Sequence, residues 1–173
     1  MLYFIVAAVL VAIDQWVKNW TVSAFAPPLD GASATLDAAK ECLPGVVELT
    51  RVHNTGAGWS SFAGQRWFLA AVSTVVVGIV LFLMIRKIVR HPFGMTAAAL
   101  IVAGGAGNLI DRVRLGYVVD MFRFEFWRSY PVFNVADICI VVGGVMAVIY
   151  YLWLYEKYDA RKTPDEETDT SDQ

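Results

Sequence analysis

The sequence predicts an all-α membrane protein, a bundle of four transmembrane helices, on three observations. Of its 173 residues, 57% are hydrophobic, which is more than a soluble domain usually carries. The apolar residues gather in four runs, each about long enough to cross a bilayer. Charged residues concentrate between these runs and at the C-terminal end. We expect spans at about 2–25, 67–85, 93–110 and 133–155, all within one domain at 1–158.

The first apolar run contains a pair of opposite charges. Asp14 and Lys18 stand one helical turn apart with the acid nearer the N-terminus, which is the favourable order for an ion pair. We expect this pair to be structural and to neutralise itself inside the bundle. A cleaved secretory signal is the alternative. It is disfavoured because no Lys or Arg precedes the run and because Asp14 lies in its middle.

The long connection after the first span is mostly polar. Residues 47–52 alternate apolar and polar side chains, which predicts a short strand. The following stretch, at 54–60, contains glycines that suit a tight turn or a close approach of the backbone to a ligand. Ser60 or Ser61 could act as a nucleophile. No GxSxG frame surrounds them and no base is fixed nearby, so a serine enzyme is disfavoured.

The third span ends in polar residues. A small residue recurs at every fourth position from 99 to 107, which lets neighbouring helices approach closely. The last turn then places Asn108, Asp111 and Arg112 on one face. These groups either line a site or simply meet water at the end of a helix.

The fourth span and the connection before it carry two acids. Residues 121–127 alternate aromatic and charged side chains, which predicts either a strand or a segment on the membrane surface beside Asp120. Asp137 lies in the fourth span, and Asn134 precedes it by one turn on the same face. The polar, acidic tail at 159–173 is expected to be disordered and cytoplasmic.

Asp120 and Asp137 are the leading candidates for function. An ionisable group at bilayer depth costs about 2.5–3.5 kcal/mol on insertion scales, so it is a functional candidate by default. Two carboxyl groups that share a site cannot both ionise easily, and they hold one proton between them. One group can then activate water while the other protonates a carbonyl oxygen, which is the chemistry of an aspartic protease.

The residues by themselves leave two other classes of function open. One is an ion or proton transporter with Asp14, Asp120 and Asp137 as relay groups. Transporters often have repeated halves, and we find no internal repeat. The other is a structural membrane subunit whose acids only pair with Lys18 and Arg112.

Composition disfavours several further classes. The basic residues form no dense patch, so nucleic-acid binding is not expected. The only histidines are His53 and His91, and no HExxH motif is present, which argues against a zinc protease. We expect no metal and no organic cofactor. Cys42 and Cys139 are far apart, and Cys139 lies in an apolar run, so we do not expect a disulfide.

The distribution of basic residues predicts the orientation in the membrane. Four spans put both termini on one side. Arg86, Lys87 and Arg90 crowd the short loop after the second span, and further basic residues follow the last span, so these regions are expected in the cytoplasm. Several basic residues in the other connections oppose this orientation, but the preference of Lys and Arg for the cytoplasmic side is weaker for long loops. The candidate site would then lie near the outer face.

Five stretches, in order along the chain, resemble the motifs of the lipoprotein signal peptidases, the bacterial signal peptidase II family. They are DQWVK at 14–18, NTGAGWS at 54–60, GGAGNLIDR at 104–112, VVDM at 118–121 and YPVFNVAD at 130–137. Each motif alone is weakly specific, but five in order on the expected spans are highly specific. The match runs from the first span to the fourth.

This chain departs from the family's usual residues at a few motif positions. Gly58 and Trp59 stand where Ala and Phe are more usual, Met121 where Phe is common, and Tyr130 in place of the usual Trp. The departures are conservative and concern the shape of the pocket rather than the chemistry.

The resemblance implies an aspartic endopeptidase of the bacterial cytoplasmic membrane. Its substrate would be a prolipoprotein that carries a diacylglyceryl group on its lipobox cysteine, and the cut would fall just before that cysteine. Asp120 and Asp137 would be the catalytic pair. The residues that would line the site or hold the pair are Asn54, Gly56, Asn108, Arg112 and Asn134. Asp14 and Lys18 would support the fold around it.

The resemblance also implies how the rest of the chain is arranged. A small β-rich platform, built from the first long loop, would rest on the outer face of the membrane. The linker before the fourth span would lie above the cleft. We expect a monomer, in contact with membrane lipid, that works without a metal or an organic cofactor.

Overall fold

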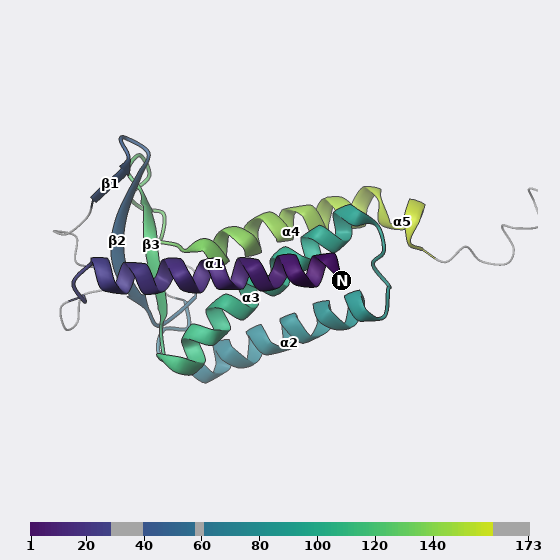
Figure 1. Cartoon of the computed structure of the whole chain (residues 1–173), viewed down its shortest axis with the longest axis horizontal. Coiled ribbons are helices and arrows are strands. Elements are labelled where there is room, and N and C mark those ends of the chain that lie inside the picture. Colours follow the sequence, from purple (N-terminus) through teal and green to yellow (C-terminus); the bar gives the residue numbers. More distant parts are fainter. Residues whose placement is uncertain (29–39, 58–60, 161–173) are drawn as a thin grey trace, which may run out of the picture.

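The computed structural model describes residues 1–28, 40–57 and 61–160. Four of its helices are long and apolar enough to cross a membrane, by length and composition. They run alongside one another, and a sheet stands across one end of the bundle (Figure 1). The elements in chain order are α1 (Leu2–Ala24), β1 (Lys40–Leu43), β2 (Val47–Asn54), α2 (Arg66–Ile85), α3 (Pro92–Arg114), β3 (Val118–Phe124), α4 (Val135–Trp153) and α5 (Tyr155–Tyr158). The predicted four-helix membrane fold is confirmed.

Helix α3 forms the centre of the bundle. It packs against α1, α2 and α4. Its most apolar stretch is 50% buried, whereas the corresponding stretches of the other three long helices are 17–22% buried. The outward faces of those helices are apolar, with Val75, Ile79 and Val148 among the exposed residues. Such faces suit contact with lipid chains, which are as apolar as the side chains themselves.

The small residues at 99–107 bring the helices close together, as their spacing predicts. A Cβ atom at Gly104 would lie 2.3 Å from the carbonyl oxygen of Ala136 on α4. A Cβ atom at Gly107 would lie 2.6 Å from the Asp14 carboxylate on α1. At Gly104 only glycine fits, because a backbone atom lies in the way, and a Cβ atom at Gly107 would push the Asp14 carboxylate out of place. Helices α1, α3 and α4 therefore pack closely at the level of the predicted site.

Several helix boundaries differ from the prediction, and two of them have a clear physical reason. Helix α3 continues to Arg114 instead of ending at 110. Polarity did not mark its end because Asp111 is buried and has partners inside the protein. The chain turns instead at Gly116, whose φ of +90° suits glycine. Helix α4 begins at Val135 rather than at 133, because Asn134 is its N-cap.

The sheet has three antiparallel strands in the order β1-β2-β3. Strand β2 contains the stretch at 47–52, so the predicted strand is confirmed. Strand β3 decides the alternatives for the linker before the fourth span in favour of a strand. We expected the sheet from the first long loop alone, and the structure corrects this. Because β3 belongs to the sheet, Asp120 is paired with Val52 of β2.

Arginine side chains fasten the ends of two helices near the sheet. Arg51 on β2 is buried and donates to the carbonyl oxygens of Val22 and Phe25, at 3.2 and 3.1 Å. Arg66 at the start of α2 donates to the carbonyl oxygen of Val113, at 3.0 Å. The last carbonyl groups of a helix lack partners within the helix, and a cation there also complements the helix dipole. These contacts position α1 and α3 against the end that carries the site.

Asp159 corrects the predicted start of the tail. Its carboxylate is buried and accepts hydrogen bonds from the backbone N–H groups of Arg90 and His91, both at 3.0 Å, and from the Tyr150 hydroxyl. The chain is therefore held in the domain as far as Asp159. Residues 161–173 of the predicted tail lie outside the described residues.

Candidate active site

Asp120 and Asp137 reach one cavity from different elements. Asp120 lies on β3, and Asp137 lies in the first turn of α4. Both line a cavity of about 430 Å³ whose walls come from β2, α2, α3, β3 and α4. Asp120 is only 1% exposed. The structure therefore brings together the two acids that the sequence predicts as a pair.

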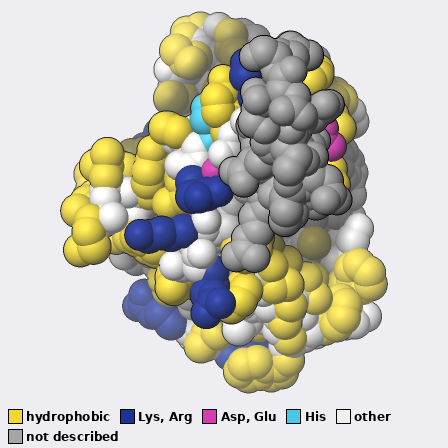
Figure 2. Space-filling model, turned by 90° about the vertical axis from the view of Figure 1, so that its right-hand side faces the viewer, with side chains coloured by type: hydrophobic (Ala, Val, Ile, Leu, Met, Phe, Trp, Pro, Cys, Tyr) yellow, Lys and Arg dark blue, Asp and Glu magenta, His cyan; other side chains and the backbone are white. Residues whose placement is uncertain are grey.

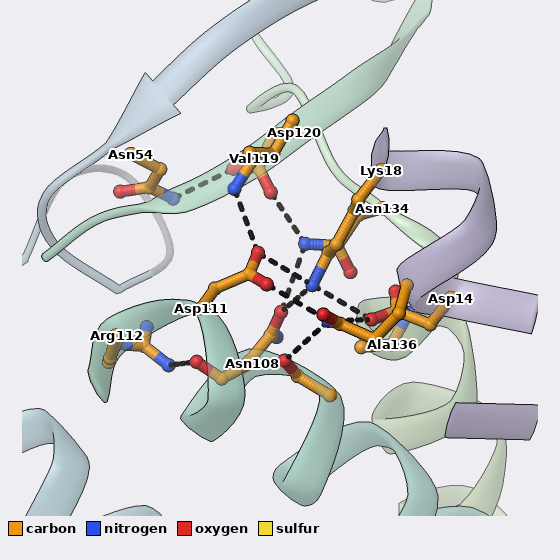
Figure 3. A network of polar contacts seen from close by, with 12 residues as sticks. Asp14, Lys18, Asn54, Asn108, Asp111, Arg112, Val119, Asp120, Asn134 and Ala136 are labelled. Carbon is orange, nitrogen blue, oxygen red and sulfur yellow. Dashed lines mark hydrogen bonds and ion pairs between the residues drawn. The ribbon is translucent and has the colours of Figure 1, made fainter. Parts of the chain in front are cut away.

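Asn134 contacts both aspartates. Its side-chain oxygen accepts the backbone N–H of Asp137 at 2.9 Å, and Asp137 Oδ2 accepts the backbone N–H of Asn134 at 3.2 Å. This reciprocal arrangement is a capping box, which satisfies free N–H groups at the start of α4. Asn134 Nδ2 also donates to Asp120 Oδ1, at 2.6 Å (Figure 3). We expected Asn134 to hold Asp137, and the structure shows that it links the two acids.

Two other asparagines each donate to one aspartate. Asn54, at the end of β2, donates through Nδ2 to Asp120 Oδ2 at 2.9 Å. Asn108 on α3 donates through Nδ2 to Asp137 Oδ1 at 2.8 Å. With the two bonds from Asn134, each of the four carboxylate oxygens accepts one N–H. Both carboxyl groups are therefore fixed in orientation.

Gly56 connects Arg112 to this network. Arg112 Nη2 donates to the carbonyl oxygen of Gly56 at 3.0 Å, and the N–H of Gly56 donates to Asn54 Oδ1 at 2.9 Å. That second bond orients the Asn54 amide, so that its Nδ2 faces Asp120. Arg112 itself lines the cavity. The turn after β2 and the end of α3 thus meet beside the acids.

The environment of Asp120 changes its acidity. Burial raises the pKa of Asp120 to about 7, and the negative charge of Asp137 beside it acts in the same direction. The hydrogen bonds from Asn54 and Asn134 oppose this rise in pKa, because they stabilise the ionised form. A carboxyl group with a pKa near neutrality can both give and take a proton at physiological pH.

A buried charged cluster lies next to the acids. We call it the Lys18 cluster, and it consists of Lys18, Asp14 and Asp111. Lys18 Nζ lies 2.9 Å from Asp14 Oδ2, the ion pair that the sequence predicts, and 3.0 Å from Asp111 Oδ2. The sequence pattern placed Asp111 on the polar face of α3 but assigned it no role. Its position in an apolar helix is the signal that could have identified it.

The remaining wall of the cavity is mostly apolar. The α2 and α4 residues in it are Leu69, Val72, Ser73, Ile140 and Val141, and the linker before α4 supplies 130–133. A smaller cavity of about 170 Å³ shares Asp137 and Phe133 with the first. Sequence reasoning missed the α2 residues, because no motif marks that span and their position depends on helix packing.

The departures from the family's usual residues differ in their relation to the cavity. Tyr130 lines both cavities. Met121 is completely buried, at 0% exposure. Gly58 and Trp59 lie outside the described residues. Among the departures that the structure describes, Tyr130 is therefore the one that shapes the candidate site.

The four membrane-length helices and the buried acid pair define a class, the membrane proteins with an acid-lined cavity. Two bacterial membrane enzyme structures, obtained by the in meso method, share the fold. The first has a TM-score of 0.76 and 24% identity, with 93% of each chain covered. The second has a TM-score of 0.73 and 25% identity, covering 88% of this chain and 93% of the other.

The chain belongs to the signal peptidase II family. The family model described as signal peptidase (SPase) II matches residues 6–153. The lipoprotein signal peptidase of Enterococcus faecalis is 39% identical over 157 residues, 91% of each chain. The one from Lactococcus lactis is 39% identical over 152 residues, 88% of this chain and 94% of the relative. The resemblance in the five motifs is confirmed, and the chain is a protease.

Proposed function

We propose that this protein removes signal peptides from prolipoproteins in the membrane, with Asp120 and Asp137 as the catalytic pair. The observation that carries the proposal is the shared cavity, in which both acids are held by asparagine side chains. The membership in the signal peptidase II family supports the reaction class. The raised pKa of Asp120 supports a proton shared between the two carboxyl groups near neutral pH.

The proposed reaction begins with one ionised and one protonated carboxyl group. The ionised group takes a proton from a water molecule, whose oxygen attacks the carbonyl carbon of the scissile peptide bond. The protonated group gives its proton to the carbonyl oxygen, which forms a tetrahedral intermediate. This intermediate then collapses: a hydroxyl proton returns to the pair, the C–N bond breaks, and the leaving nitrogen takes the other proton. The pair ends with the one proton that it had at the start.

We propose a substrate whose lipobox cysteine carries a diacylglyceryl group, with the cut just before that cysteine. The smaller cavity supports this, because its lining is largely apolar and reaches Asp137. Two of its lining residues on α4, Ile138 and Val142, are 45% and 44% exposed on the outer surface of the bundle. The acyl chains could therefore remain in the bilayer while the peptide bond reaches the acids.

Arg112 and the three asparagines have supporting roles in this proposal. The Arg112 guanidinium carries five N–H donors, and its bond to Gly56 fixes one edge of the group. A longer contact joins its Nη1 to the carbonyl oxygen of Asn108, at 3.5 Å, and we propose that the remaining donors bind backbone carbonyl groups of the substrate. Asn54, Asn108 and Asn134 hold the carboxyl groups. All these residues come from one chain, so we propose that the monomer is active.

We place both termini in the cytoplasm and the acid pair near the outer face. Figure 2 views the end of the molecule away from the sheet, and Lys and Arg side chains gather there. They include Arg86, Lys87 and Arg90, which surround a cavity at this end. Basic residues in short loops favour the cytoplasmic side. At the opposite end, Arg51 and Arg66 bond to helix carbonyl groups, so their presence there has a structural reason.

Cleavage of a defined substrate tests the proposal. The purified enzyme in detergent is incubated with a diacylglyceryl-modified prolipoprotein. In a separate reaction it is incubated with the same prolipoprotein without the lipid. We expect mass spectrometry to locate a single cut just before the modified cysteine and to find the unmodified protein intact. A cut at another bond, or equal cleavage of both substrates, would show that the assigned substrate is wrong.

A further inference from the structure

Lys18 occupies the centre of a buried network that the proposed reaction does not use. Its side chain is 3% exposed, and Nζ lies within hydrogen-bond distance of three oxygens. These are Asp14 Oδ2 at 2.9 Å, Asp111 Oδ2 at 3.0 Å and Asn108 Oδ1 at 2.9 Å. An ammonium group has three N–H donors, so each donor has an acceptor.

Each carboxylate in the Lys18 cluster also holds a peptide group next to a candidate catalytic acid. Asp14 Oδ1 accepts the backbone N–H of Ala136 at 2.9 Å. Asp111 Oδ2 accepts the backbone N–H of Val119 at 3.1 Å. Ala136 immediately precedes Asp137, and Val119 immediately precedes Asp120. One lysine thus connects the backbone positions from which both acids extend.

The third contact of Lys18 reaches Asp137 through a side chain. Asn108 Oδ1 accepts from Lys18 Nζ and from Asn134 Nδ2, at 2.9 and 3.1 Å. With its oxygen on that side, the amide must turn Nδ2 toward Asp137 Oδ1, at 2.8 Å. The reverse orientation would direct an NH₂ group at an ammonium group. The charge on Lys18 therefore determines that Asn108 donates to Asp137.

Simple neutralisation of charge does not explain this composition. A single carboxylate would neutralise the ammonium group, yet two are buried beside it, at 1% and 3% exposure for Asp14 and Asp111. A buried charge without full compensation is costly, and hydrogen bonds from Gln15 to both carboxylates relieve only part of that cost. The bond from the Val119 N–H to Asp111 explains why this second carboxylate is present.

We propose that Lys18, Asp14 and Asp111 are positioning residues that set the relative placement of Asp120 and Asp137. The lysine holds both carboxylates, each carboxylate holds the peptide before one acid, and the lysine orients the amide that donates to Asp137. This inference rests on the proposed function, since it assigns a purpose to the placement of the catalytic pair. It extends the structural role expected for Asp14 and Lys18 and adds Asp111.

The test compares Lys18→Met with the double variant Lys18→Met/Asp14→Asn. The double variant removes one positive and one negative charge, so the cluster keeps its net charge and the protein is expected to recover much of the thermal stability lost in Lys18→Met. Turnover should not recover, because without the lysine nothing holds the side chains at positions 14 and 111 together or orients the Asn108 amide. We expect kcat about 100-fold below wild type, as for a reacting group misplaced by about 1 Å, with little change in KM.

The pH profile separates positioning from stability alone. The charged groups around the pair are Lys18 and Asp14 from α1 and Asp111 and Arg112 from α3; β2 contributes the neutral Asn54. In Lys18→Met, loss of the lysine charge should move the high-pH limit of activity upward, because an adjacent cation favours the ionised form of Asp120. A variant that only unfolds more easily would lose amplitude and keep the wild-type profile.

Asp159→Asn is the matched control, because it alters another buried carboxylate with several donors, at the far end of the bundle. It should lower stability and leave kcat and the pH profile of the folded protein unchanged. Wild-type kcat in the double variant, or an unmoved pH limit in Lys18→Met, would overturn the positioning proposal while the function stands. If wild-type protein cuts no lipid-modified substrate, the proposed function itself fails.

Discussion

Asp120 combines near-complete burial with hydrogen bonds from two amide donors. Burial and the neighbouring Asp137 raise its pKa, while the amide groups of Asn54 and Asn134 limit the rise. The balance leaves the pKa at about 7. At the scale of single residues, the proposed chemistry therefore depends on polar side chains that keep the acid ordered without removing its proton.

The pH dependence of activity follows from this pKa. Below about pH 7 the pair retains its shared proton, and above that value Asp120 loses it. We expect kcat/KM to fall as the pH rises beyond about 7, since no proton is then available for the carbonyl oxygen. A series of initial rates between pH 5 and pH 9, about two units either side, measures this limb. A rate that stays constant to the alkaline end would contradict a shared proton on Asp120.

Arg112 allows a test of geometry at constant charge. Arg112→Lys keeps the positive charge but loses the planar guanidinium. A lysine ammonium group cannot bond to the Gly56 carbonyl oxygen and present donors to the cavity at the same time. We expect a loss of about tenfold or more in kcat/KM, with an unfolding temperature near that of wild type. Steady-state kinetics and a thermal melt measure the two. Wild-type kinetics would remove Arg112 from the site.

The resemblance in the motifs, more than residue types alone, indicated which side chains lie around the two acids. The residues assigned from the motifs, including Asn54, Asn108 and Asn134, do surround the two acids. The direction of each amide could not be predicted, because it depends on which neighbours donate and accept in three dimensions. Asp111 was not assigned for the same reason. The proposed role of Asp111 depends on its contacts with Lys18 and Val119. Lys18 is far from it along the chain, and Val119 belongs to a strand that the sequence pattern left undecided.

Helix α3 is the element on which the site depends. It carries Asn108, Asp111 and Arg112 on adjacent turns, and it touches the other three long helices. Its glycines set how closely α1 and α4 approach, and therefore where Asp14 and Ala136 lie relative to it. At the scale of elements, the small and the polar residues of α3 act together. The small residues let α1 and α4 approach α3 closely, and the polar residues make the hydrogen bonds there.

Gly104→Ala tests the close contact between α3 and α4. Its Cβ atom would lie 2.3 Å from the carbonyl oxygen of Ala136, and a backbone atom cannot move aside easily. We expect a loss of about 1–3 kcal/mol in the free energy of unfolding, and reduced activity because Ala136 adjoins Asp137. Thermal unfolding in detergent and initial rates measure both effects.

Gly144→Ala is the control for that substitution. It lies in α4, where an added Cβ atom meets nothing within 4 Å. Stability should be unchanged or slightly higher, because alanine favours the helix. Equal destabilisation by both substitutions would mean that the close contact with Ala136 is not what matters at Gly104.

The elements were predictable where one local pattern decided them. The four apolar runs and the alternation in β2 gave correct types, since hydrophobic periodicity is a local property. The boundaries at Arg114 and Val135 were less accurate, because buried polar residues continue α3 and a side-chain cap begins α4. The membership of β3 in the sheet depends on pairing with β2, a distant segment, and the aromatic-charged alternation fits a membrane surface equally well.

The whole molecule has two chemically different ends. The sheet and the acid pair lie at one end, and the short α2–α3 connection with its basic residues lies at the other (Figure 1). The apolar outward faces of the helices separate these ends. This asymmetry supports the proposed orientation of the protein in the membrane. The distribution of charged residues along the sequence predicted it. The position of the sheet at the same end as the acids was not predictable from charge.

The two native cysteines, with one introduced cysteine as a reference, test the orientation. Cys42 is free and exposed on β1, and Cys139 is free and buried in α4. In spheroplasts, we expect a membrane-impermeant maleimide to label Cys42 and to leave Cys139 unlabelled. The Cys42→Ser variant provides the blank, and a cysteine at Ser171 should react only after permeabilisation. Labelling of Ser171→Cys in intact spheroplasts, with Cys42 protected, would reverse the orientation.

The most direct test of the central claim is turnover by Asp120→Asn and Asp137→Asn. Each substitution keeps the shape of the side chain and removes its ability to exchange a proton, so we expect both folded variants to lose cleavage of the lipid-modified prolipoprotein almost completely. Circular dichroism and thermal melts in detergent establish that the variants remain folded. Turnover within about tenfold of wild type in either folded variant would contradict catalysis by the pair, since general acid–base chemistry contributes about 10²–10⁴-fold to a rate.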